Sequence, residues 1–178
     1  AKGGLLGGGF TATATGGPPG VGSYRQWDTR LDGLLAQAIV SIPGCKAMAL
    51  GDGVQSASQP GSEVHDIPVF GKRGLRHETN RAGGVTGGVT NGEPVVVHGM
   101  MKPISTLLKP LRTVDLKTRQ PAKAHYERSD ICVVPAAGVV GEAMVALVLA
   151  SAVLEKFGGD SMAEVERNLK GYLRGLPG

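Results

Sequence analysis

The sequence predicts an α+β domain in which antiparallel strands pack on long helices, and three observations support this class. Short apolar runs with strand character, such as Pro94–Met101, alternate irregularly with two long segments of helical spacing. The connections are short and rich in Gly and Pro, without a regular strand–helix–strand rhythm. With 178 residues, of which 41% are hydrophobic and 19% charged, the chain can form one domain, residues 1–178, with its own core.

The first part of the chain predicts a strand, a helix and a second strand. Apolar residues alternate with threonine over Phe10–Thr15, which indicates a half-buried strand. Over Asp28–Ile42 apolar residues recur every three or four positions, which predicts an amphipathic helix that Pro43–Gly44 ends. The apolar run Cys45–Leu50 predicts another strand, and the polar region Gln55–Lys72 predicts a loop.

The second part predicts more strands and then two helices. Thr113–Leu116 and the segment around Ala124 favour an antiparallel pair of strands. Further on, Ser161 and Glu164 have the spacing of a capping box, which predicts the start of the last helix after the Gly158–Gly159 break.

The segment Ile131–Phe157 is apolar almost all round, and its length alone is sufficient to span a membrane. Pro135 near its start, Glu142 within it and its many Gly and Ala residues favour a buried helix that Pro135 begins. Glu142 then has to face a polar partner or an interface, because an unpaired buried carboxylate is costly.

Polar groups of different chemical kinds are concentrated in the stretch Asn80–Asp130. Two glycine pairs precede the central strand, and glycine lets the backbone approach a planar or anionic ligand closely. The string Lys102–Thr106 follows that strand with a cation, two hydroxyls and backbone N–H groups, which suit a phosphate or the edge of a flavin. Arg128 and Asp130 add a cation and a carboxylate two residues apart. A plain turn, a strand end and a salt bridge at a helix start are the alternatives.

Other classes of site are disfavoured. The net charge of +4 favours anionic partners, but the cations are spread along the chain without aromatic platforms, which argues against nucleic-acid binding. Cys45 and Cys132 lie in apolar surroundings without metal-ligand spacing, which indicates buried thiols of a reducing compartment. His65 and Asp66 are adjacent and therefore point in different directions, so a solvated loop pair is favoured over catalytic partners.

Five strings of residues resemble the C-terminal half of bacterial chorismate synthases, in the same order and with nearly uniform spacing. They are GSYRQWDTRLDGLLAQAIVSIPGCK, GDGVQSASQPGSEVHD, TNRAGGVTGGVTNGEPVVVHGMMKPISTL, ERSDICVVPAAGVVGEAMVALVLA and LEKFGGDS, which together cover about Gly16 to Leu169. The resemblance implies half of a β-α-β sandwich. It also implies that the N-terminal half of the family, with its GESHG-like and RPGHAD-like motifs and two catalytic histidines, is absent here.

The resemblance further implies a carbon–oxygen lyase of the shikimate pathway, in aromatic amino acid biosynthesis. The family converts 5-enolpyruvylshikimate 3-phosphate to chorismate and phosphate by 1,4-anti elimination. It needs reduced FMN, which NADPH or another reductant supplies, and it is a cytoplasmic homotetramer. We therefore expect neither a membrane nor a nucleic-acid partner, and we expect this chain alone to be inactive. The alternative is a non-catalytic FMN- or phosphate-binding module, or a structural half that needs a partner chain.

The resemblance also assigns site residues, motif by motif. It implies that Asp130 is the catalytic base that takes a proton from flavin N5. The place of Asp130 just before an apolar helix predicts that it is partly desolvated. The implied cofactor-binding residues are Pro43, Gly44, Gly87, Lys102, Pro103, Ile104, Ser105, Thr106 and Arg128.

Overall fold

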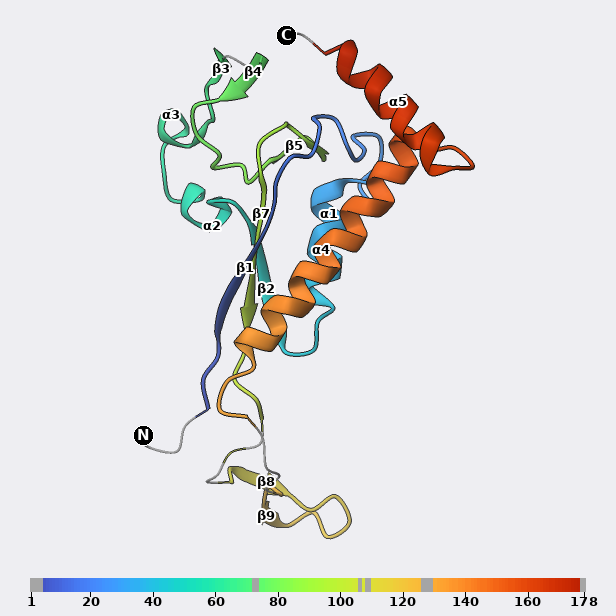
Figure 1. Ribbon diagram of the computed structural model, residues 1–178. Helices are drawn as coiled ribbons and strands as arrows, with labels where there is room; N and C mark the ends of the chain where they lie inside the picture. Colours follow the sequence, from blue (N-terminus) through green and yellow to red (C-terminus); the bar gives the residue numbers. More distant parts are fainter. Residues whose placement is uncertain (1–4, 72–73, 106, 108–109, 126–129, 177–178) are drawn as a thin grey trace.

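The computed structural model describes residues 5–71, 74–105, 107, 110–125 and 130–176, and it confirms the α+β class (Figure 1). A small antiparallel sheet lies at the centre, and two helices cover one of its faces. In chain order the elements are β1 (Gly8–Ala14), α1 (Leu31–Val40), β2 (Cys45–Leu50), α2 (Gly53–Ser56), α3 (Gly61–Val64), β3 (Pro68–Gly71), β4 (Gly74–His77), β5 (Val85–Thr86), β6 (Val89–Thr90), β7 (Val95–Met101), β8 (Arg112–Val114), β9 (Pro121–Lys123), α4 (Val134–Phe157) and α5 (Met162–Arg174).

The middle strand of the central sheet is β7, which pairs antiparallel with β1 on one side and with β2 on the other. Val95, Val97 and Met101 are buried because alternate residues of β7 face the helices. On β1, Phe10 lies opposite Gly99 of β7. The three strands predicted for this part of the chain are therefore confirmed, with ends that differ by two residues or fewer.

The helix predicted from Asp28 is α1, which packs on β2 and on α4. Leu31, Leu35 and Ile39 recur at helical spacing and are fully buried, so the predicted amphipathic face is the face that meets the core. Beside α1, α4 runs across β1, and the two helices together form one layer on the sheet (Figure 1).

Two glycines allow α4 to lie close to the sheet. Gly141 of α4 and Gly99 of β7 both lie against the ring of Phe10. A Cβ atom on Gly141 would lie 2.7 Å from Phe10 Cζ, and one on Gly99 would lie 2.6 Å from Phe10 Cε1. Carbon atoms in a close-packed interior do not approach so closely, so this contact depends on both glycines.

The predicted ends of the last two helices are confirmed. Pro135 lies in the first turn of α4, where its missing N–H costs no hydrogen bond, and Gly158 ends the helix with a φ of 41°. At the start of α5, the Ser161 side chain accepts a hydrogen bond from the Glu164 N–H at 3.4 Å. The Glu164 carboxylate in turn accepts one from the Asp160 N–H at 2.7 Å, which completes the cap.

The prediction that α4 is buried on all sides is wrong for this chain. In its most apolar stretch the mean hydropathy is 2.1, yet only 22% of that stretch is buried, and the helix is also long and apolar enough to cross a membrane. Val139, Leu147 and Leu154 are 69%, 64% and 51% exposed, and Glu142 is exposed as well. The reason is that α4 packs on the sheet, on α1 and on α5, while Val139, Leu147 and Leu154 stay exposed on its outer face.

The predicted loop Gln55–Lys72 contains more regular structure than its polar sequence suggests. The end of α2, the single turn of α3 and strand β3 all fall within it, and β3 forms a two-stranded hairpin with β4. Short helices and strands of this kind lack a periodic apolar pattern, so the sequence did not indicate them.

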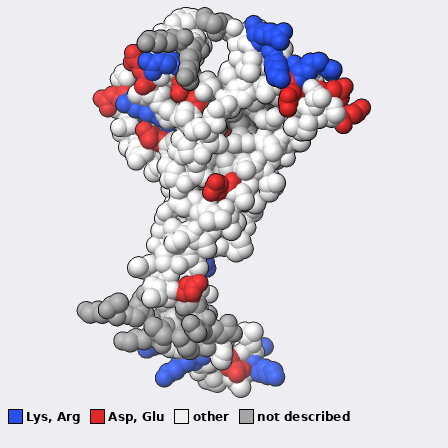
Figure 2. All heavy atoms as spheres, viewed as in Figure 1, with Lys and Arg blue, Asp and Glu red and all other residues white. Residues whose placement is uncertain are grey.

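Strands β8 and β9 form the predicted antiparallel pair, which projects from the end of the molecule opposite α5 (Figure 1). The first strand ends at Val114, two residues before the predicted end, because the Asp115 carboxylate accepts hydrogen bonds from the N–H groups of Lys117 and Thr118 and turns the chain. Figure 2 shows Lys and Arg side chains gathered on this hairpin.

Candidate ligand-binding cavity

A cavity of about 490 Å³ lies at the end of the central sheet where β7 ends and α4 begins. Three segments far apart in the sequence form its wall: the turn between α1 and β2, the chain that leaves β7, and the start of α4. The lining residues are Ile42, Pro43, Gly44, Met101, Lys102, Pro103, Ile104, Ser105, Val133, Ala136, Ala137 and Val140. Six of the predicted cofactor-binding residues are therefore neighbours in the fold.

The turn after α1 is fixed to the chain that leaves β7. The Lys102 N–H donates a hydrogen bond to the Gly44 carbonyl at 2.9 Å, and the next residue of β2, Cys45, pairs with Met101. Gly44 has a φ of 86°, which favours glycine, and a Cβ atom there would lie 3.3 Å from Met101 Cε. The turn thus keeps a side chain out of this part of the wall.

The cavity is mostly apolar, with its cationic character at one side. Among its lining residues only Lys102 carries a charge, and its side chain is exposed, as is Ser105. The first turn of α4 supplies Ala136 and Ala137 to the same wall, so the positive end of a 24-residue helix also faces this region. An apolar wall beside a cation and a helix N-terminus suits a planar ligand that carries an anionic group.

Asp130 lies next to this wall in the chain, but its side chain is exposed. The N-terminal segment lies between the chain after Asp130 and the chain that leaves β7. The Leu6 N–H donates a hydrogen bond to the Ile131 carbonyl at 2.9 Å, and Leu6 forms a parallel bridge with Cys132. A Cβ atom on Gly7 would lie 2.9 Å from Pro103 Cδ, so this segment fits between Pro103 and Ile131. The expected partial desolvation of Asp130 is not found in this chain.

Of the remaining predicted residues, the structure describes only Gly87, and it does not bring Gly87 to the cavity. Gly87 is exposed in the turn between β5 and β6, with a φ of 65° and open space around it. The β5–β6 hairpin lies beside the start of β7, where the Val96 N–H donates to the Gly83 carbonyl, whereas Lys102 follows the end of β7. The seven extended residues of β7 span about 20 Å. Thr106 and Arg128 lie outside the described residues.

The apolar wall of the cavity was not predicted from the sequence. Val133, Ala136, Ala137 and Val140 all line it, and their spacing of three, one and three places them on one helix face. This spacing was the available signal. It was hidden because every face of this helix is apolar.

Asp66 is not the solvated loop residue that was expected, although His65 beside it is exposed. The Asp66 carboxylate accepts hydrogen bonds from the N–H groups of Arg81 and Ala82, at 2.8 and 2.9 Å, and from the Thr79 hydroxyl. Partial burial raises the pKa of Asp66, but the hydrogen bonds outweigh it and hold the pKa below its ordinary value. Asp66 therefore orders the loop that precedes the glycine pairs.

Comparisons with known proteins give one consistent family. The family model described as chorismate synthase matches residues 1–154. Chorismate synthase from Tropheryma whipplei is 54% identical over 172 residues, which are 97% of this chain and 43% of the relative. The enzyme of the same name from Thermobifida fusca is 54% identical over 171 residues, which are 96% of this chain and 44% of the relative.

A solved structure agrees with the sequence relatives. A crystal structure of chorismate synthase matches with a TM-score of 0.80 and 42% identity, over 97% of this chain and 44% of that one. The chain therefore spans less than half the length of the relatives that it matches. The resemblance of the five sequence strings is confirmed, and the chain belongs to the chorismate synthase family.

Proposed function

We propose that this chain forms the flavin- and phosphate-binding half of a chorismate synthase, a lyase of aromatic amino acid biosynthesis. Its reaction would convert 5-enolpyruvylshikimate 3-phosphate to chorismate and inorganic phosphate by 1,4-anti elimination. The observation that carries this proposal is the cavity, in which Pro43 and Gly44 meet Lys102–Ser105 although nearly sixty residues separate them in the sequence.

The residues of the cavity fit a reduced FMN. Ile42, Met101 and Val140 offer apolar walls for a planar ring system, and Gly44 leaves space where another residue would place a Cβ atom. Lys102 and the hydroxyl of Ser105 would hold an anionic group at the open side. The volume of about 490 Å³ lies within the range of known ligand pockets.

When bound, the reduced flavin would supply the electron density that assists the departure of phosphate. The protein would bind and orient the reactants. Lys102 would stabilise negative charge beside the first turn of α4, whose positive dipole end lies at the same wall. Asp130 would act as the base that accepts a proton on its carboxylate, because it lies three residues before Val133 of the cavity wall.

The complete reaction would need more than one copy of this chain. Gly87 and Lys102 lie beyond opposite ends of β7, which spans about 20 Å, so we infer that both residues contact one flavin only if they come from different copies or if the chain rearranges. This separation supports the homo-oligomer that the resemblance implies. Because the chain also spans less than half of its relatives, we expect no chorismate from the isolated chain with substrate and reduced FMN. A cytoplasmic location and reduction by NADPH are further parts of the proposal.

A second candidate function is that of an FMN- or phosphate-binding half without catalysis of its own. The length of the chain, which is less than half that of its relatives, favours this candidate. A chain that contributes only part of an active site would still bind the cofactor. The two candidates differ in one measurement. Formation of chorismate after the missing part of a relative is added supports the enzyme, and its absence despite FMN binding supports the binding module.

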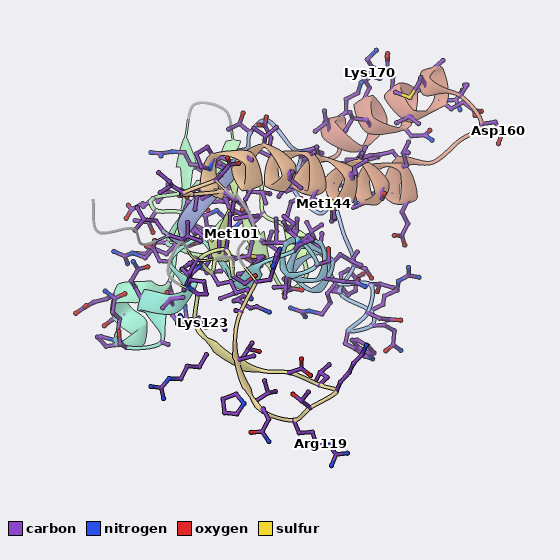
Figure 3. All side chains as sticks on the ribbon, turned by 90° about the horizontal axis from the view of Figure 1, so that it is seen from below. Met101, Arg119, Lys123, Met144, Asp160 and Lys170 are labelled. Atoms are coloured by element: carbon purple, nitrogen blue, oxygen red, sulfur yellow. The ribbon has the colours of Figure 1, made fainter. Side chains whose placement is uncertain are left out.

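The test of the site is an FMN titration that follows flavin fluorescence with the wild-type chain and with Lys102→Ala. Loss of a charged hydrogen bond weakens binding by about 1.5 to 3 kcal/mol, so we expect roughly a 10- to 150-fold increase in Kd. Lys170→Ala is the matched control, because Lys170 is exposed on α5, and Figure 3 shows it far from Met101 of the cavity. Equal affinity of wild type and Lys102→Ala would contradict the assignment.

A further inference from the structure

Most of the net positive charge of the chain lies on the β8–β9 hairpin, residues 110–125. These residues include four cations and one carboxylate, that of Asp115, so their net charge is +3, whereas the net charge of the whole chain is +4. The four cationic side chains are all exposed, and they belong to Arg112, Lys117, Arg119 and Lys123. The lower end of the molecule in Figure 2 therefore carries a concentrated positive charge.

Two of these cations lie directly opposite each other in the hairpin. Arg112 of β8 pairs with Lys123 of β9 in the antiparallel ladder. Side chains of opposite residues project from the same face, and like charges in this position destabilise the pairing. The next pair on that face, Val114 and Pro121, offers no carboxylate. Each strand is only three residues long, so this hairpin is marginally stable and nevertheless carries a repulsive pair.

The acidic residue of the hairpin does not neutralise this pair. The Asp115 carboxylate accepts hydrogen bonds in the turn from the N–H groups of Thr118 and Lys117, at 2.8 Å each. These hydrogen bonds hold the pKa of Asp115 below its ordinary value, so the carboxylate is ionised but occupied by the backbone. Within the part of the chain that the structure describes, neither Arg112 nor Lys123 forms a salt bridge.

The hairpin lies at the same end of the molecule as the cavity. In the sequence it lies between two parts of the cavity wall, because it follows Ser105 and precedes Val133. In Figure 1 it projects beyond the end of β7 and the start of α4, which contribute to that wall. A ligand that approaches the cavity from this end therefore also approaches the cations.

We propose that Arg112 and Lys123 form a binding site for the phosphate group of a small ligand. A phosphate between them would accept hydrogen bonds from the guanidinium and the ammonium group and would remove their mutual repulsion. Arginine binds phosphate as a planar fork and lysine as a point charge, so the two side chains complement each other. The site does not depend on the proposed function, which enters only in the source of the phosphate. The candidate sources are 5-enolpyruvylshikimate 3-phosphate, FMN and free phosphate.

A small phosphate ligand fits this surface better than a nucleic acid does. Proteins that bind single strands combine a track of cations with aromatic side chains on which bases stack. Residues 110–125 contain no Phe, Tyr or Trp, and Lys117 and Arg119 lie beyond the ladder, in the turn. A phosphate monoester needs only the two adjacent cations.

The test is a titration of the 178-residue chain with inorganic phosphate, followed by NMR of the backbone amides. The amide signals of residues 112 and 123 should shift with a Kd on the order of 1 mM at low ionic strength, as two charged hydrogen bonds provide. Arg112→Glu should raise this Kd roughly 10-fold or more. Lys117→Glu is the matched control, because it changes the charge of the same hairpin equally but lies beyond the ladder. It should raise the Kd less than about 3-fold.

The same variant separates a binding role from a structural one. Arg112→Glu places a carboxylate opposite Lys123, and opposite charges in this position stabilise the ladder. We therefore expect hydrogen exchange of the β8–β9 amides to slow by roughly 1.4- to 5-fold while phosphate binding weakens. A residue with only a structural role would not show this combination. Faster exchange in Arg112→Glu would contradict the repulsion between Arg112 and Lys123 and overturn the proposal.

Further titrations identify the source of the phosphate. FMN and riboflavin differ only in the phosphate, so shifts of residues 112 and 123 with FMN alone would assign the site to the cofactor. Shifts with 5-enolpyruvylshikimate 3-phosphate would assign it to the reactant, and shifts with inorganic phosphate only would assign it to free phosphate.

Three results would overturn the site: no shifts with any phosphate, equal shifts with sodium chloride at the same ionic strength, or equal effects of Arg112→Glu and Lys117→Glu. The titration with inorganic phosphate involves neither flavin nor turnover. A failure of the proposed function and a failure of this site can therefore be told apart.

Discussion

Replacement of Gly141 by alanine tests how α4 is held on the sheet. In an exposed helix interior, Gly→Ala stabilises a protein by about 0.5 to 1 kcal/mol, because alanine loses less backbone entropy on folding. At Gly141 we expect the opposite sign. The new Cβ atom would lie 2.7 Å from Cζ of Phe10, whose ring is already held against Gly99.

The expected magnitude follows from the geometry. The Phe10 ring cannot move away without displacing β7 or α4, and overpacking of this kind costs about 1 to 3 kcal/mol. After subtraction of the gain in helix propensity, Gly141→Ala should lower the free energy of unfolding by about 0.5 to 2 kcal/mol. Gly138→Ala, one turn earlier, is the matched control, because its Cβ atom would lie at an ordinary 3.6 Å from Phe10 Cβ.

Urea unfolding followed by circular dichroism measures both variants. The two substitutions are chemically identical and lie on the same helix, so their difference isolates the contact with Phe10. A double variant that also carries Phe10→Ala should show no penalty for the alanine at 141. If Gly141→Ala stabilised the chain as much as Gly138→Ala does, the close approach of α4 to the sheet would be refuted.

Two further predictions concern carboxylates. Because the hydrogen bonds to Asp66 lower its pKa in the folded chain, the stability that it contributes is fully present above about pH 4 and is lost as the pH falls through the folded value. Asp66→Asn should therefore lower the free energy of unfolding by about 1 to 2 kcal/mol at pH 7 and by less at pH 3, measured by urea unfolding with Glu63→Gln as the control. In an assembled enzyme, Asp130→Asn should reduce kcat by roughly 10²- to 10⁴-fold and leave the Kd for FMN nearly unchanged. An unchanged kcat together with weaker FMN binding would refute the role of Asp130 as the base.

Elements with strong local signals were predictable from the sequence. The alternation in β1, the three- and four-residue spacing in α1 and the capping box at Ser161 each reflect a local physical requirement, and each is found in the structure. The segment Gln55–Lys72 was not predictable, because α2, α3 and β3 are short and take their stability from contacts such as those of Asp66 with Arg81 and Ala82. Such contacts join residues more than ten positions apart, which a local pattern does not encode.

The cavity was predictable in part. Pro43, Gly44 and Lys102–Ser105 were assigned from the resemblance, and the pairing of β2 with β7 now gives the physical reason for their proximity, since it places the ends of the two segments side by side. The position of Gly87 beyond the start of β7 could not be foreseen, because a motif assigns a residue to a ligand without placing it in the fold.

The apolar pattern of α4 shows what a sequence leaves undetermined. A helix that is apolar on every side has no pattern that distinguishes the face on the sheet from the face on another partner. In the structure the buried face carries the small residues Ala137, Gly141 and Ala152 as well as the larger Val145 and Phe157, and Gly141 permits a close approach to Phe10 of β1. The outer face carries Leu147 and Leu154, which project from the helix. The contact of Gly141 with Phe10 thus fixes which face of α4 meets the sheet, and a contact with a residue more than a hundred positions away is not encoded in the local apolar pattern.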